Sequence, residues 1–470
     1  MQRFFRVGRG VHHTTLLSKI RLIILQIVEI MNTDKKTKRS ISSGVVSFLL
    51  LILFATAAVF AVSYFALPAL FSVSYSEYTP AATLTSPTGK TPVPQKPVAS
   101  SVAHLATPSP MKAIYMSQCV VGTPSFRDSL IKMIDTTDLN SVIIDIRDYT
   151  GKISFPTESP GLKDAVSDAC GAKDMKSFIA KLHEKNIYVI GRITTFQNPY
   201  YTKLHPEQAV QKAGGGVWKD YKGLAFVDVG AKAYWDNVVE LGKISYELGF
   251  DELNFDYVRF PSDGPMKDAV YSYNVGKSKP VALEEFFKYL HEKLEPTGAV
   301  LSADLFGMTA TNYDDLNIGQ VLERALPYFD HIYPMVYPSH YPKGYNGYSD
   351  VNEHSYDIVK IAMDTAVSRT IATSTKIAGL AYTPIMKTVV VPATATTATT
   401  TKEVASGLYS KPVYPASKIR PWLQSFDYPV PYTPAMVAAQ IKATSDAGID
   451  SWLFWDAGNK YTSLKAVLAE

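Results

Sequence analysis

From residue 112 onward, short apolar runs alternate with longer amphipathic stretches. The runs are rich in Val, Ile, Leu and aromatic residues, which is typical of strands buried on both faces. They predict strands at 112–116, 141–147, 187–193, 252–258, 300–305, 331–336, 418–423 and 451–455. Helical periodicity between them predicts helices that include 174–185, 233–248, 283–294, 354–367 and 434–447.

Eight strands joined by helical crossovers predict an α/β protein, a (β/α)₈ barrel of the TIM type over residues 111–470. A doubly wound open sheet is the alternative, but it calls for a Gly-rich loop after the first strand, and the sequence has none there. Residues 377–417 interrupt the alternation. We expect an insertion before the seventh strand, on the face away from the barrel mouth, with a hairpin of KIAGLAY and KTVVV. If KIAGLAY is itself the seventh strand, the order of the last strands changes.

The first 110 residues have a different pattern. About 23 uncharged residues, starting at Val45, are long enough to cross a bilayer. They predict a transmembrane helix at 45–70, after a cytoplasmic segment at 1–44 with Lys35, Lys36, Lys38 and Arg39 next to the membrane. Residues 71–110 are rich in Pro, Thr and Ser and predict a linker. A cleaved signal peptide is the alternative. We expect a single-pass protein of the cell membrane with an extracytoplasmic barrel.

Composition excludes several classes of function. The formal net charge of the 470 residues is only +4 and no dense basic block occurs, so we expect no nucleic-acid partner. Two cysteines cannot make a Cys-rich metal site, and the 9 histidines form no H-E-x-x-H pair, so we expect no metal and no cofactor. Cys119 and Cys170 form a bridge if the domain is outside the cell. The other interpretation, which we favour from the sequence, is two free buried thiols.

Alternation along the strands assigns side chains to the barrel interior. On the fourth strand it selects Asn254, Asp256 and Val258, with Tyr257 on the other face. Elsewhere it selects Asp145, Arg147, Arg192, Ser302, Asp304, Tyr333, Met335, Tyr337, Arg420, Trp422, Gln424, Trp452, Phe454 and Asp456, with Trp455 facing outward. Charged side chains inside a barrel, at the carboxyl ends of its strands, favour an active site. The alternative is a salt-bridge network of Asp145, Arg147, Arg192 and Asp256 that plugs the barrel.

The chain resembles a family of bacterial barrels described as a "putative glycosyl hydrolase domain". The resemblance is carried by LNSVIIDIRDYTGKI, IYVIGRITTFQNP, LGFDELNFDYVRFPSDG, SADLFGM, YPMVYPSHYPKGYNG, IRPWLQSF and SWLFWDAGNKY. It implies a carbohydrate-active barrel with a catalytic aspartate near the end of the fourth strand, here Asp256. The chain departs from the expected pattern at Arg147, where we expect lysine, and at Asp456, where we expect asparagine. The FVDVG segment at 226–230 also differs, and these changes concern substrate choice more than fold.

Glycoside hydrolysis needs two carboxyl groups across the scissile bond. We predict Asp256 as nucleophile or base and Asp304 as acid, with Asp145, Asp148 and Asp456 as alternatives for the second role. The predicted substrate-binding residues are Asp145, Arg147, Arg192, Asn254, Arg259, Tyr337, His340, Arg420, Trp422, Trp455 and Asp456. The sequence thus predicts a membrane-anchored glycosidase that acts on cell-wall or extracellular polysaccharide. The rival hypotheses are a non-catalytic glycan-binding barrel, a metal-dependent hydrolase and an inert structural barrel.

Overall fold

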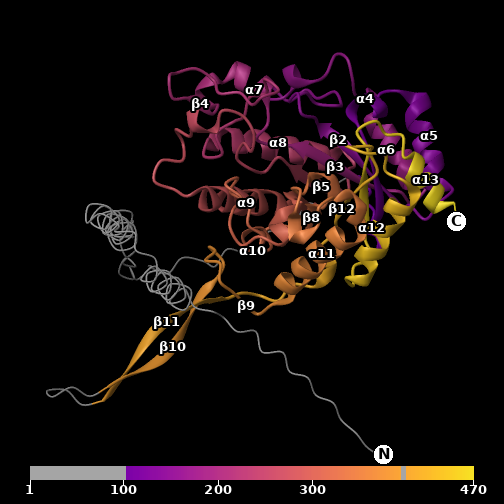
Figure 1. Cartoon of the computed structure of the whole chain (residues 1–470). Coiled ribbons are helices and arrows are strands. Elements are labelled where there is room, and N and C mark those ends of the chain that lie inside the picture. The colour runs from indigo at the N-terminus through magenta and orange to yellow at the C-terminus, as the bar shows by residue number, and fades with distance from the viewer. Residues whose placement is uncertain (1–101, 393–398, 470) are drawn as a thin grey trace, which may run out of the picture. The chain divides into compact units, whose positions relative to one another are not determined.

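The computed structural model of the chain describes residues 102–392 and 399–469, and eight parallel strands form a closed barrel there (Figure 1). Each strand pairs with the next one along the chain, and the last closes against the first. In chain order they are β1 (Lys112–Met116), β2 (Ser141–Arg147), β3 (Tyr188–Thr194), β5 (Glu252–Asp256), β7 (Val300–Phe306), β8 (His331–Met335), β12 (Trp422–Gln424) and β13 (Trp452–Trp455). The predicted (β/α)₈ barrel is confirmed.

A helix follows every barrel strand and returns the chain to the start of the next. In order they are α5 (Pro124–Asp135), α6 (Met175–Glu184), α8 (Lys232–Leu248), α9 (Lys279–Leu294), α10 (Leu322–Ala325), α11 (Ser355–Ile371), α12 (Pro434–Asp446) and α13 (Thr462–Leu468). α8 buries Tyr234, Val238 and Leu241 on one face, as an amphipathic helix over a sheet should. It ends at Gly249, whose φ of 124° only glycine adopts readily, and the chain then turns into β5.

Two apolar clusters make up most of the core. The larger one fills the layer between strands and helices and includes Ile144, Leu253 and Phe286. The smaller one fills the inside of the barrel and includes Ala113, Ile190 and Leu453. Below this smaller cluster, at the amino ends of the strands, the buried Glu252 accepts hydrogen bonds from tyrosines of β3 and β8. Buried side chains therefore fill this end of the barrel.

Loops after the strands build up the mouth. They carry the short helices α4 (Gln118–Val121) and α7 (Pro199–Leu204) and a two-stranded ribbon of β4 (Gln211–Lys212) and β6 (Ala269–Val270). The ribbon links the loop after β3 to the loop after β5. A third apolar cluster of Val210, Trp218 and Phe226 packs beneath it, against Tyr257. These loops add a wall to one side of the mouth.

The insertion between α11 and β12 is a long hairpin that projects from the barrel (Figure 1). β10 (Thr383–Val391) pairs with β11 (Thr400–Ser410), and β11 also pairs with β9 (Ser374–Thr375). The predicted pairing of KIAGLAY with KTVVV is wrong, because residues 376–382 form a loop and KTVVV (387–391) pairs with residues 400–404. A helix-to-strand connection enters at the amino ends of the strands, so the hairpin leaves the barrel opposite the mouth.

The predicted cytoplasmic segment at 1–44, the transmembrane helix at 45–70 and the linker up to residue 101 lie outside the described residues. In the ranges 102–392 and 399–469, no helix combines the length and apolar character that a membrane span requires.

Cys119 and Cys170 form a disulfide, with their Cα atoms 4.4 Å apart. The bond joins α4, in the loop after β1, to the loop between β2 and α6. The expectation of two free thiols is therefore wrong. Spacing along the sequence did not reveal that the two loops meet at the mouth, where the backbone N–H of Gly171 also donates to the carbonyl of Gln118.

Candidate active site

A cavity of about 330 Å³ opens at the mouth of the barrel. Its charged lining residues come from the carboxyl ends of β3, β5 and β7 and from the loop after β5. Most of the others are aromatic or apolar. The full set is Arg192, Asp256, Tyr257, Arg259, Asp304, Phe306, Gly307, Met308, Met335, Tyr337, His340, Tyr341, Trp422 and Trp455.

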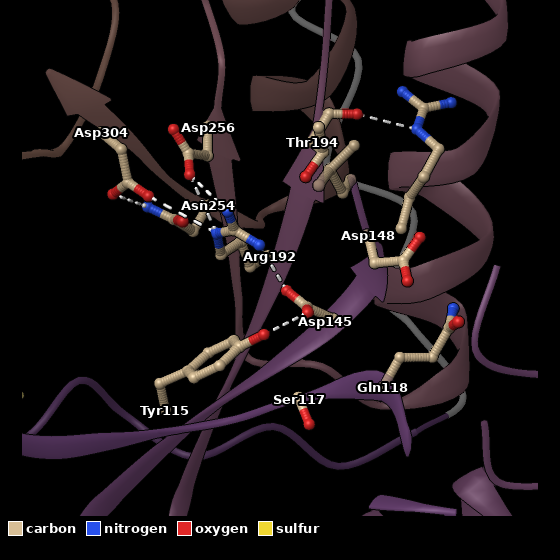
Figure 2. A network of polar contacts seen from close by, with 12 residues as sticks. Tyr115, Ser117, Gln118, Asp145, Asp148, Arg192, Thr194, Asn254, Asp256 and Asp304 are labelled. Carbon is tan, nitrogen blue, oxygen red and sulfur yellow. Dashed lines mark hydrogen bonds and ion pairs between the residues drawn. The ribbon is translucent and has the colours of Figure 1, made fainter. Parts of the chain in front are cut away.

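Arg192 of β3 is at the centre of the polar contacts under this cavity, and Figure 2 shows its guanidinium between Asp256 and Asp145. Nε and Nη2 both donate to Oδ2 of Asp256, at 3.0 and 2.5 Å. Nη1 donates to Oδ1 of Asp145 at 2.5 Å. Burial lowers the pKa of Arg192, but the carboxylates of Asp256 and Asp145 outweigh that effect and raise it well above its ordinary value.

Asp304 of β7 is almost fully buried. Its Oδ1 accepts hydrogen bonds from Nε1 of Trp422 at 2.8 Å and from Nδ2 of Asn254 at 2.9 Å. Burial raises the pKa of Asp304 well above its usual range, and the nearby carboxylate of Asp256 raises it further. Since both donors point at Oδ1, a proton on this carboxyl group belongs on Oδ2, which is 3.9 Å from Nε of Arg192.

Asp256 ends β5 and accepts hydrogen bonds through both of its carboxylate oxygens. Oδ2 accepts from Arg192, and Oδ1 accepts from the backbone N–H of Tyr257 at 2.5 Å. Asp256 and Asp304 follow the last paired positions of two neighbouring strands, Phe255 and Ala303. Their Oδ2 atoms lie 3.0 and 3.9 Å from the same nitrogen of Arg192, so they are at most about 7 Å apart.

Asp145 of β2 supports this arrangement from below the cavity. Its Oδ2 accepts from the hydroxyl of Tyr115 at 2.5 Å, and its Oδ1 accepts from Arg192. Burial raises the pKa of Asp145. The ring of Tyr115 stacks on Trp455 with 3.9 Å between ring centroids. Asp145 does not line the cavity, so its contacts position Arg192. Alternation along β1 would have identified Tyr115, which we did not consider.

Several predicted substrate-binding side chains do line the cavity. They are Arg192, Arg259, Tyr337, His340, Trp422 and Trp455. Asn254 lies just beneath it, between Asp304 and Ser302. Burial raises the pKa of Tyr337, and the carboxylates of Asp304 and Asp256 add to the rise. Burial lowers the pKa of His340.

The prediction that Arg147 points into the barrel is wrong. The pairing of β2 with β3 shifts register between Asp145 and Arg147, so that Arg147 lies opposite Ile193. Its Nε donates to the carbonyl of Thr194 and its Nη1 to Asn237 of α8. This irregularity reverses the alternation, and the side chain packs under the outer helices. Arg147 is therefore absent from the network that we considered as a plug of the barrel.

Arg420 and Asp456 do not line this cavity, although Asp456 lines a second cavity beside it. Arg420 points inward, but at the amino ends of the strands, 3.7 Å from Glu252. The carboxylate of Asp456 accepts hydrogen bonds from the backbone N–H groups of Gly458, Lys460 and Tyr461 and so shapes the loop after β13. Asp148, which we considered for the second carboxyl role, accepts from Thr150 in its own loop.

Alternation gave the wrong face at two further places. On β13, Trp452 and Phe454 pack in the outer cluster, whereas Leu453 packs in the interior cluster and Trp455 lines the cavity. After Asp256 the chain leaves the extended conformation, because Tyr257 has a φ of 51°. Tyr257 therefore turns into the cavity, and Val258 joins the outer cluster. A left-handed tyrosine has no sequence signature.

A second cavity, of about 900 Å³, continues from the first across the loops after β12 and β13. The two share Tyr337, His340 and Trp455 as lining residues. Within the described parts of the chain, no group of three or more His, Cys, Asp or Glu side chains is placed to hold a metal ion.

Comparison with known proteins gives a match to one sequence family and matches to many solved structures. A family described as "Putative glycosyl hydrolase domain" matches residues 113–384 and 381–461. No curated protein matches the chain. A hypothetical protein from Ruminiclostridium thermocellum is 29% identical, with 44% of this chain and 98% of that one covered and a TM-score of 0.38.

Two other solved structures are less similar in sequence. The glycoside hydrolase domain of PgaB from Bordetella bronchiseptica is 12% identical, with 76% of this chain and 98% of that chain covered and a TM-score of 0.47. The α-galactosidase of Thermus thermophilus is 10% identical, with coverage of 78% and 63% and a TM-score of 0.42. These scores are low, so the assignment rests on the sequence match, which spans most of the barrel. The chain belongs to the family described as "Putative glycosyl hydrolase domain".

Proposed function

We propose that the protein is a glycosidase that hydrolyses a polysaccharide with Asp256 and Asp304. The observation that carries the proposal is the unequal environment of two close carboxyl groups at one cavity. Asp256 accepts three hydrogen bonds, two of them from a cation, as an ionised nucleophile or base does. Asp304 has a raised pKa, which a general acid at neutral pH requires.

The separation of the two groups supports a retaining mechanism. Retaining enzymes hold their carboxyl groups about 5 Å apart, whereas inverting enzymes need about 6.5–9.5 Å to admit a water molecule. The upper bound of about 7 Å between the Oδ2 atoms and the neighbouring strands both favour the shorter range. In this proposal Asp304 protonates the leaving oxygen through Oδ2, while Asp256 attacks the anomeric carbon. Water then releases the sugar, with Asp304 as base.

The second cavity supports a polymeric substrate. It lies beside the first cavity, and the two share Tyr337, His340 and Trp455 as lining residues. Aromatic rings are suited to packing against sugar rings. We therefore expect several sugar units to bind at once, with cleavage inside a chain. The size distribution of early products distinguishes this from release of single sugars.

Membrane anchoring and action outside the cytoplasm are part of the proposal. The uncharged stretch at 45–67 supports the anchor. The Cys119–Cys170 disulfide supports an oxidising compartment. Protease added to intact cells should degrade the barrel and spare a cytoplasmic marker. Full protection of the barrel in intact cells would contradict this location.

Hydrolysis itself is tested by incubating the full-length chain with a panel of glycans and measuring new reducing ends. The non-catalytic glycan-binding barrel is the second candidate, and the low exposure of Asp304, 1%, favours it. That candidate predicts binding to a glycan in the panel without any new reducing ends. Retention of anomeric configuration in the first product supports Asp256 as nucleophile, and inversion assigns it as base.

A further inference from the structure

Arg259 is a buried guanidinium in the cavity wall without a carboxylate partner among the described residues. It is 6% exposed and lines the cavity beside Asp256. Its Nη1 donates to the carbonyl of Phe260 at 3.1 Å. In the part of the chain that the structure describes, none of the ion pairs includes Arg259, and no hydrogen bond from its Nε or Nη2 is found. Two adjacent donors are thus left for a ligand.

Two other buried arginines pair with carboxylates inside the protein. Arg192 pairs with Asp145 and Asp256, and Arg369 pairs with Glu323. Arg147 has no carboxylate either, but it packs under α8 and does not line the cavity. A buried charge is normally paired, because removing it from water is costly. An unpaired arginine that faces an open cavity therefore suggests that its partner arrives with the ligand.

Aromatic rings hold the Arg259 guanidinium in place without neutralising it. Its central carbon lies 4.8 Å from the ring centroids of both Tyr257 and Phe306, and 5.7 Å from that of Phe226. Such packing fixes the plane of the guanidinium before a ligand binds. Burial lowers the pKa of Arg259, and Tyr257 and the carboxylates of Asp256, Asp263 and Asp220 offset this only in part, whereas the carboxylates raise the pKa of Arg192.

The charged groups that line the cavity are equal in number but differ in their partners. They are two arginines, Arg192 and Arg259, and two aspartates, Asp256 and Asp304. The raised pKa of Asp304 favours its neutral form, and Asp256 is already taken up by Arg192. One positive charge, that of Arg259, then has no counterpart in the lining. A neutral or cationic sugar would leave Arg259 without a hydrogen-bonded carboxylate, whereas an anionic sugar would supply one.

We propose that Arg259 forms a subsite for the carboxylate of a uronic acid in the glycan substrate. The inference rests on the proposed function for the identity of the ligand as a glycan. A planar guanidinium with two adjacent free donors matches a carboxylate, which it can bind through two parallel hydrogen bonds. The subsite lies next to Asp256, so the uronic acid occupies a position at the scissile bond or one unit away.

The test compares a charged ligand with an uncharged derivative of the same sugar chain. An oligogalacturonide and its methyl ester have the same chain, but the ester has no carboxylate. Binding to the full-length chain is measured by calorimetry at low and at high salt. We expect the acid to bind at least about tenfold more tightly than the ester, since a hydrogen-bonded charge pair forms in a buried site. A sulfated oligosaccharide and an amino-sugar oligosaccharide are included as further probes.

Two variants attribute the preference to Arg259. Arg259→Gln should remove the difference between acid and ester, whereas Arg259→Lys should retain part of it, because charge remains while the planar fork is lost. Unchanged binding of the methyl ester shows that each variant is folded at the site. In the unaltered protein, equal binding of acid and ester overturns the inference, and so does tighter binding of the amino sugar. Tighter binding of the sulfated sugar than of the uronate overturns the assignment to a carboxylate.

The outcome is independent of hydrolysis. If the acid is preferred but no glycan is cleaved, the anionic subsite stands and the proposed glycosidase activity fails. If a glycan is cleaved and the loss of charge on the ligand changes nothing, the activity stands and the subsite fails.

Discussion

The guanidinium of Arg192 donates two hydrogen bonds to a single oxygen of Asp256, Oδ2, from Nε at 3.0 Å and from Nη2 at 2.5 Å. The remaining terminal nitrogen donates to Asp145. One cation thus orients the proposed nucleophile from below and leaves its upper side open to the cavity. The alternative that we considered from the sequence, a salt-bridge network that plugs the barrel, describes these contacts in part. The network lies under the cavity and does not fill it.

Replacing Arg192 should destabilise the protein strongly. Arg192→Leu would leave Asp145 and Asp256 buried without their cation, and breaking a buried pair in this way costs about 3–5 kcal/mol. Urea unfolding followed by fluorescence measures the change. The control is Lys185→Ala, which removes an exposed pair with Asp135 and should cost less than about 1 kcal/mol. Equal effects of the two substitutions would show that Arg192 does not stabilise the site.

The raised pKa of Asp304 predicts how activity depends on pH. As the proposed acid, Asp304 works in its protonated form, so kcat/KM should fall as the pH rises through its pKa. That fall should begin well above the usual aspartate range. The stability of the protein should also fall as the pH rises. The unfolded chain releases this proton first, so the free energy of unfolding should decrease as the pH rises from the ordinary aspartate pKa to that of Asp304. Asp304→Asn should remove both effects, and a rate that rises over this range would contradict the assignment.

Trp422 should shift the pH dependence of the activity without taking part in the reaction. Its Nε1 donates to Oδ1 of Asp304 at 2.8 Å, a hydrogen bond that favours the ionised form. Trp422→Phe keeps an aromatic ring but removes the donor, so the pKa of Asp304 should rise further. We expect the alkaline limb of the pH profile to move to higher pH. A loss of activity with an unshifted limb would mean that Trp422 acts through packing alone.

The Cys119–Cys170 disulfide should contribute measurably to stability. It closes a segment of 51 residues at the barrel mouth. Removing such a bond typically costs about 2–5 kcal/mol, because the unfolded chain regains freedom. Cys119→Ser combined with Cys170→Ser should lower the midpoint of thermal unfolding, and reductant should lower that of the original protein by a similar amount. The double variant itself should not respond to reductant.

The sequence predicted the fold well because each strand and helix is a local pattern. Runs such as SVIIDIR in β2 are mostly apolar and fully buried, and the amphipathic α8 packs against β5 as its periodicity indicates. The same simple alternation brought Asp256, Asp304 and Arg192 together, since each is on a regular part of its strand. The alternation of side chains along regular strands is therefore enough to predict the central residues of the candidate site.

The errors occur where the backbone departs from regularity. A register shift in β2 turned Arg147 outward, and the left-handed Tyr257 turned a ring inward. On β13 the polar Asp456 suggested the wrong inward face, although its carboxylate serves a loop. These departures depend on tertiary contacts, such as the packing of Ile146 over Gly191, where a Cβ would approach Ile146 Cδ1 to 2.1 Å. The order of residue types along the chain does not reveal such contacts between distant segments.

The central claim is that Asp256 carries out glycoside hydrolysis, and Asp256→Asn tests it most directly. The variant keeps the size of the side chain and removes its charge. On a glycan that the original protein cleaves, we predict a loss of reducing-end release of about 1000-fold or more, with thermal unfolding showing a folded protein. The control is Asp138→Asn, whose side chain is 80% exposed and should leave the rate unchanged. Full activity of Asp256→Asn would contradict the account.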